Sequence, residues 1–199
     1  QAILFYWDAM QAELYIEAIR AAMRLQPVSV AVMRSFGRVP FVDVELIRGA
    51  EVEMPRWLAE ILEARGLVEV RRDIRGSSDV NKIRFSEEDL AKRSAAILSR
   101  VPLDFYISVE RLLRDLGERV RKGSSPDDLR ELEAISRSIN RLLSIRVQKI
   151  LLASILHTER SQDFEKNLSL EEKVLYRLVD DDVKYWLRRA VGGGYGGSS

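Results

Sequence analysis

Few side chains in this 199-residue sequence stand out as candidates for chemistry: one histidine, His157, and a run of three aspartates, Asp180–Asp182. Cysteine is absent, which excludes disulfides, thiolate metal ligands and a cysteine nucleophile. A single imidazole excludes metal sites built from several histidines. Because Thr158 follows it, His157 also lacks the adjacent aspartate of helical metal phosphohydrolases. We expect His157 at a helix C-terminus, where a cation is favourable.

The three aspartates are expected to form a solvated helix face. Consecutive helical residues point about 100° apart, so at most two of these carboxylates could face one ion. A helical metal-dependent hydrolase that uses Asp180–Asp182 stays open as a remote alternative. A glycine-rich phosphate loop is missing, because Gly192–Gly194 follow the last expected helix instead of preceding one. The sequence therefore predicts no catalytic residue, no metal ligand and no cofactor.

Charge is balanced along the chain, with 32 basic and 31 acidic residues and a net charge of +1. Without a positive field we expect direct DNA binding to be weak or absent. The basic cluster Arg111–Lys122 has two interpretations, compensation of a helix dipole or contact with an acidic partner or DNA. The longest apolar run, at 150–156, is far short of the roughly 20 residues of a membrane span. No membrane association is expected.

The first part of the chain reads as a helix followed by a small β-rich module. Residues 1–27 form the N-terminal helical segment, in which apolar residues recur at three- and four-residue steps. Residues 28–71 form the module, with strands expected at 28–34, 41–47 and 67–70. A short helix between them should begin at Pro55 and end at Gly66.

The rest of the chain is expected to be helical. Residues 72–85 are polar and read as a linker, and 86–191 as a helical domain. Its helices are expected at 86–100, at 102–123, at 126–157 and at 170–190, the last capped by Ser169 and Glu172. The glycine-rich tail 192–199 is expected to be flexible. The fold class is therefore α+β, mainly α: a small N-terminal β-rich module followed by a helical bundle domain.

Burial in this domain should be completed by other chains. A helix over 126–157 spans about 45 Å, more than a four-helix unit of this size can cover. The tryptophans Trp57 and Trp186 are either core aromatics or anchors for another protein. We expect a subunit interface formed by Trp57, Leu58, Leu132, Ile139, Leu142, Leu143, Ile150, Leu175 and Trp186.

Residues 42–70 resemble the small β-domain of the GINS family of DNA replication proteins. The matching positions are Arg48–Gly49, Glu51–Glu53, Pro55, Trp57–Leu58–Ala59, Leu62 and Gly66. Three helical stretches echo that family's helical domain: 103–113, 141–155 with Arg146 and Lys149–Ile150, and 169–179. The order of β-module before helical domain is that of one archaeal GINS subunit and two eukaryotic ones.

The resemblance implies a non-catalytic subunit of a GINS heterotetramer that scaffolds the replicative helicase. Its partners would be other GINS subunits, the MCM helicase and a Cdc45- or RecJ-like protein. It would be cytoplasmic and nucleoid-associated in an archaeon, which the arginine-rich composition favours, and nuclear in a eukaryote.

An alternative from another class is a transcriptional regulator with a winged-helix-like module and a helical dimerisation domain. Against it, the charges of the one short helix in the module, on Arg56, Glu60, Glu63 and Arg65, sum to zero. A recognition helix needs donors directed at phosphates and bases.

Overall fold

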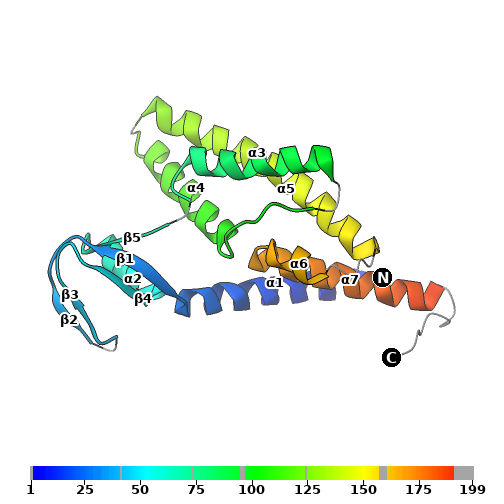
Figure 1. Ribbon diagram of the computed structural model, residues 1–199, viewed down its shortest axis with the longest axis horizontal. Coiled ribbons are helices and arrows are strands. Elements are labelled where there is room, and N and C mark those ends of the chain that lie inside the picture. Colours follow the sequence, from blue (N-terminus) through cyan, green and yellow to red (C-terminus); the bar gives the residue numbers. More distant parts are fainter. Residues whose placement is uncertain are drawn as a thin grey trace. The chain divides into compact units, whose positions relative to one another are not determined.

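The computed structural model describes residues 2–40, 42–72, 74–94, 97–123, 125–156 and 161–190. It is mainly helical, with small antiparallel sheets that precede a helical bundle in the chain, as the sequence predicts (Figure 1). Two compact units are present, one formed by Leu14–Asp73 and the other by Gln1–Glu13 together with Ile74–Ser199. The first helix, α1, covers Ala2–Leu25, so the division falls within it.

The unit Leu14–Asp73 contains two small sheets. Strand β1 (Pro27–Val32) lies between β4 (Glu51–Pro55) and β5 (Val68–Val70), antiparallel to both. A two-stranded ribbon joins β2 (Gly37–Val39) to β3 (Val44–Leu46). Of the strand predicted at 41–47, only Val44–Leu46 is a strand. Strand β2 lies where the sequence indicated only a break at Gly37 and Pro40, and it is three residues long.

Helix α2 (Arg56–Ala64) closes this unit against the sheet. Pro55 stands at its N-cap position, so the helix begins one residue after the predicted start. Gly66 ends it with a φ of 69°, and the N–H groups of Gly66 and Leu67 donate to the carbonyls of Glu63 and Leu62. This is the left-handed C-terminal cap that the sequence predicts. The core beneath α2 is aliphatic; its fully buried members are Val30, Leu46 and Ala59.

In the helical unit, α5 (Pro126–Leu156) packs against three other helices. These are α3 (Ser77–Arg93), α4 (Phe105–Arg121) and α7 (Leu170–Ala190), and a short α6 (Ser161–Lys166) precedes α7 (Figure 1). The predicted bounds of α4, α5 and α7 agree with the structure to within a few residues where the chain is described. One core lies around Phe105, Leu116, Ile135 and Leu142, and a smaller one around Ile150.

The predicted linker at 72–85 is wrong from Ser77 onward, because α3 begins there. The Gly-Ser-Ser-Asp sequence is typical of a loop, but here Gly76 is the N-cap residue of α3 and the next three residues begin its first turn. The Asp79 carboxylate accepts a hydrogen bond from the N–H of Arg75, and Val80 is fully buried in the core. The predicted helix start at residue 86 is also wrong, since Ser86 lies inside α3, and the helix ends at Arg93 instead of about Arg100.

His157 and the tail 192–199 lie outside the described residues, so their predicted roles stay predictions. Among the helices that are described, none is long and apolar enough to cross a membrane.

Candidate functional site

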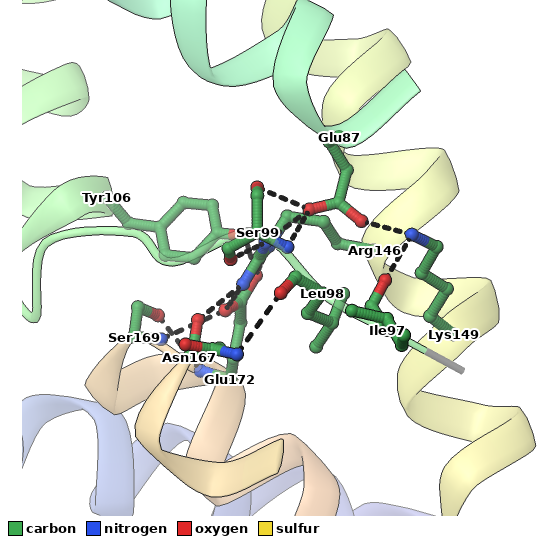
Figure 2. A network of polar contacts seen from close by, with 10 residues as sticks. All are labelled: Glu87, Ile97, Leu98, Ser99, Tyr106, Arg146, Lys149, Asn167, Ser169 and Glu172. Carbon is green, nitrogen blue, oxygen red and sulfur yellow. Dashed lines mark hydrogen bonds and ion pairs between the residues drawn. The ribbon is translucent and has the colours of Figure 1, made fainter. Parts of the chain in front are cut away.

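A network of charged side chains lies at the centre of the helical unit (Figure 2). Arg146 of α5 is completely buried and contacts carboxylates from two other helices. Its Nε and Nη2 donate to the two oxygens of Glu172 on α7 at 2.5 and 2.7 Å. Its Nη1 donates to Oε2 of Glu87 on α3 at 2.8 Å. Arg146 therefore connects three helices that are far apart in the sequence.

Lys149 completes the charge balance one helical turn further along α5. Its ammonium donates to Oε1 of Glu87 at 2.6 Å, and Figure 2 shows the two side chains pointing toward one another. Two cations, Arg146 and Lys149, thus face two carboxylates, Glu87 and Glu172, inside the protein. Paired and hydrogen-bonded charges of this kind avoid the large cost of burying an isolated ion.

The ionisation of these groups follows from their partners. Burial alone would raise the pKa of Glu87, but hydrogen bonds from Lys149 and Ser99 hold that pKa below its ordinary value. Burial alone would likewise lower the pKa of Arg146, but its bonds to Glu172 raise it. Burial, followed by the charge of Glu172, raises the pKa of Tyr106, whose hydroxyl donates to Glu172 at 2.6 Å. Glu87 is therefore held ionised and Arg146 protonated near neutral pH.

The network also holds residues 97–99 in place, which belong to no helix or strand. The carbonyls of Ile97 and Ser99 accept hydrogen bonds from Lys149 Nζ at 2.5 Å and Arg146 Nη1 at 2.9 Å. Between them, the Leu98 carbonyl accepts one from Asn167 Nδ2 at 3.2 Å. The N–H and hydroxyl of Ser99 donate to Glu87. Side chains thus satisfy backbone groups that a helix or sheet would otherwise satisfy.

In this arrangement the two carboxylates of the network are bound inside the fold. The oxygens of Glu87 and Glu172 are occupied by cations and backbone donors, so neither carboxylate is free to move a proton or to hold a metal ion. Within the described ranges, no group of three or more histidine, aspartate or glutamate side chains could bind a metal.

The sequence identified only one part of the network. The predicted cap of the last helix is confirmed, because the Ser169 N–H donates to Glu172 at 2.9 Å and the Glu172 N–H donates to the Ser169 hydroxyl at 3.2 Å. The role of Arg146 was missed. The available signal was its position, together with Lys149, on the same face of α5 as the buried Leu142 and Ile150.

The predicted interface residues fall into three groups. Leu58, Ile139, Leu142 and Ile150 are buried in the chain's own cores, so they have no surface to offer a second subunit. Half-buried positions that pack against these cores are Trp57, Leu132, Leu143 and Leu175. Trp186 is 65% exposed near the end of α7. Helix α3, whose first half was predicted to be a linker, packs along α5 within the chain, and the subunit interface stays a prediction.

Several of the apolar side chains that remain exposed lie at two helix ends of this unit. Leu151, Ile155 and Leu156 lie at the C-terminal end of α5, and Tyr185 and Trp186 near that of α7. Surfaces of this kind are typical of contacts with another protein. We call them the α5 end and the α7 end.

Each of the two charged clusters that the sequence singled out contains ion pairs. The Lys184 Nζ donates to Asp180 Oδ2 at 2.5 Å, and this hydrogen bond is the largest of the causes that raise the pKa of Lys184. In the basic cluster, Arg114 pairs with Glu110, and Arg119 of α4 pairs with Asp128. Local charge compensation is thus the role that the geometry supports for both clusters.

Comparison with known families decides the identity of the helical part. Residues 76–191 match the helical bundle domain of GINS complex proteins (Sld5), and this range is more than half of the chain. The chain belongs to the GINS family. A search of curated proteins finds no match. The matched GINS domain begins one residue before α3, so it contains Glu87, Arg146 and Glu172 and therefore the whole network.

The GINS match also bears on the other predictions. It confirms the resemblance of the helical stretches, while the β-rich module lies outside the matched residues and its resemblance stays a prediction. It assigns the helices to a GINS bundle. The alternative of a transcriptional regulator, which needed these helices as a dimerisation domain, is therefore not supported. GINS subunits are non-catalytic scaffolding proteins of DNA replication.

Proposed function

We propose that this GINS subunit scaffolds the replicative helicase as one member of a heterotetramer. The observation that carries the proposal is the match of residues 76–191 to the GINS helical bundle. The partners would be other GINS subunits, the MCM helicase and a Cdc45- or RecJ-like protein. The chain would act at chromosomal DNA, near the nucleoid of an archaeon or in a eukaryotic nucleus, without binding DNA strongly itself.

The surface of the helical unit supports assembly. Ile155 and Leu156 of the α5 end are more than half exposed, and Trp186 of the α7 end is 65% exposed. Burying such a side chain against a partner gains roughly 1.5–3 kcal/mol. We therefore place contacts with other GINS subunits at these two ends, with the half-buried Leu143 and Leu175 at their margins.

The internal network supports scaffolding of this kind. Partner surfaces are recognised well when they are held rigid before binding, because less freedom is lost on association. Arg146 fixes α5 and α7 against one another through Glu172. The two helix ends are thus carried by elements that are connected inside the chain.

The division into parts belongs to the proposal as well. We keep the helix within 1–27, the β-rich module at 28–71 and the helical domain as separate functional regions, with the module as the GINS small β-domain. The resemblance of residues 42–70, centred on Pro55 and Trp57, supports this assignment.

Substitution of the exposed ends tests the proposal. The variants Ile155→Asp and Trp186→Asp should each reduce the amount of other GINS subunits that copurifies with the tagged chain by about tenfold, because a charge would be buried at the contact. Phe85→Asp is the matched control, since Phe85 is an equally exposed apolar residue on α3. Unchanged copurification in both variants would remove these helix ends from the interface.

A further inference from the structure

The outer face of the β2–β3 ribbon exposes an apolar pair. The register of the ribbon ends with the pair of Gly37 and Leu46, and Phe36 and Ile47 are the next residue of each segment. The Phe36 N–H donates to the Leu46 carbonyl at 3.0 Å, one residue out of that register, so Phe36 and Gly37 both lie beside Leu46 as in a bulge. Val39 and Leu46 point to the core from the other face, whereas Phe36 is 59% exposed and Ile47 55% exposed.

Unpaired arginines lie beside this pair. Arg34 and Arg48 are exposed, and among the residues that the structure describes neither guanidinium has an ion-pair partner. The Arg48 N–H donates to the Ser35 hydroxyl at 3.0 Å, so the segments before β2 and after β3 run side by side. Met33, also exposed, adds a third apolar side chain. We call Met33, Arg34, Phe36, Ile47 and Arg48 the ribbon patch.

The acidic side chains of the ribbon, Asp43 and Glu45, lie toward its turn. Two residues along from Phe36, Arg38 lies opposite Glu45 and forms an ion pair with Asp43, so these three residues together carry a charge of −1. The whole unit Leu14–Asp73 has equal numbers of basic and acidic residues. The positive excess beside Phe36 and Ile47 is therefore local.

We propose that the ribbon patch docks an acidic segment of a partner protein, whose apolar side chains cover Phe36 and Ile47 while its carboxylates pair with Arg34 and Arg48. Exposed apolar groups with a charged rim are the usual composition of a protein contact. Arginine pairs with carboxylates through two parallel hydrogen bonds, which gives the contact direction as well as attraction.

A nucleic acid fits this surface less well. Single-stranded binding relies on several aromatic rings for base stacking and on a basic groove that follows the backbone. The patch has one ring, Phe36, next to two aliphatic side chains, Met33 and Ile47, and Arg38 is already neutralised. A protein segment is therefore the occupant that we infer.

The inference goes beyond the assembly function and is tested separately from it. The assembly proposal depends on the α5 and α7 ends, whereas the ribbon patch belongs to the unit Leu14–Asp73. Failure of the docking test would leave subunit assembly unaffected, and loss of assembly would leave docking unaffected.

Fluorescence anisotropy with the full chain is the experiment. The probe is a fluorescein-labelled peptide, Asp-Asp-Leu-Glu-Phe-Asp-Glu, and the matched probe replaces every Asp by Asn and every Glu by Gln. The acidic peptide should bind, more weakly as salt is added, and the neutral peptide should not. Phe36→Ala should weaken binding about tenfold, and the double variant R34Q/R48Q about fivefold.

Phe85→Ala is the control variant, because it removes an equally exposed phenylalanine from the other unit. It should bind the acidic peptide like the wild type. Equal binding of the two peptides, affinity unchanged by Phe36→Ala, or binding of a labelled oligothymidylate in preference to the acidic peptide would each overturn the proposal. Concentration-dependent self-association that Phe36→Ala abolishes would do so too, since the occupant would then be a second copy.

Discussion

Arg146 and Glu172 form a two-pronged ion pair inside the helical unit, with Nε and Nη2 each donating to one carboxylate oxygen at 2.5 and 2.7 Å. The Arg146 side chain is completely inaccessible to solvent. Glu172 also receives the Ser169 N–H, so the residue that caps α7 is the residue that ties α7 to α5. Local helix capping and long-range packing thus depend on one side chain.

Removing the arginine should destabilise the protein strongly. Arg146→Met leaves Glu87 and Glu172 buried without their main cation, a loss of about 3–5 kcal/mol in the free energy of unfolding. Urea denaturation followed by circular dichroism measures it. Arg137→Met is the control, because that exposed arginine pairs only with Glu133 on the surface, and it should change stability by less than about 1 kcal/mol. Equal effects of the two substitutions would show that the network contributes little.

Glu87 and Lys149 should act on stability as a coupled pair. Their oxygen–nitrogen distance is 2.6 Å and both side chains are buried. In a double-mutant cycle with Glu87→Gln and Lys149→Met, we expect a coupling energy of about 1 kcal/mol or more. Additive effects of the two substitutions would mean that Lys149 contributes through its backbone bond to Ile97 alone.

Stability should fall in acid through Glu87. Its pKa in the folded protein lies below the ordinary value of 4.5, so its contribution is present above the unfolded pKa and is lost as pH falls through the folded pKa. The wild type should therefore lose more stability than Glu87→Gln when urea denaturation is compared at about pH 7 and about pH 3. An identical pH dependence in both proteins would show that Glu87 is not ionised in the fold.

The cap of α7 should contribute separately. Ser169→Ala removes the hydroxyl that accepts the Glu172 N–H and should cost about 1 kcal/mol of unfolding free energy. Ser144→Ala is a suitable control, because its exposed hydroxyl only donates to a carbonyl within α5. If thermal denaturation gives the same midpoint for both variants, the cap is energetically unimportant.

Elements with a strong local signal could be predicted from the sequence. Helix α7 has a capping box at Ser169 and Glu172, and Pro126 opens α5, so both were placed closely. Gly66 likewise gave the end of α2 because a left-handed cap depends on one residue. Each of these features depends on a few residues that are neighbours in the sequence.

The missed features depend on contacts between distant residues. Helix α3 has a polar sequence, and its stabilising core contacts, through Val80, come from residues far along the chain. Arg146 gave no sign of its partners, because Glu87 is 59 positions away in the sequence. For the same reason the sequence assigned buried residues such as Leu142 to a partner interface: the first half of α3, which shares their core through Val80, was not recognised as a helix.

Native mass spectrometry of the tagged chain, purified gently from its native host, tests the central claim most directly. The account predicts a heteromeric complex whose mass includes other GINS subunits, with little free monomer. A stable monomer at micromolar concentration, isolated without any GINS partner, would contradict it.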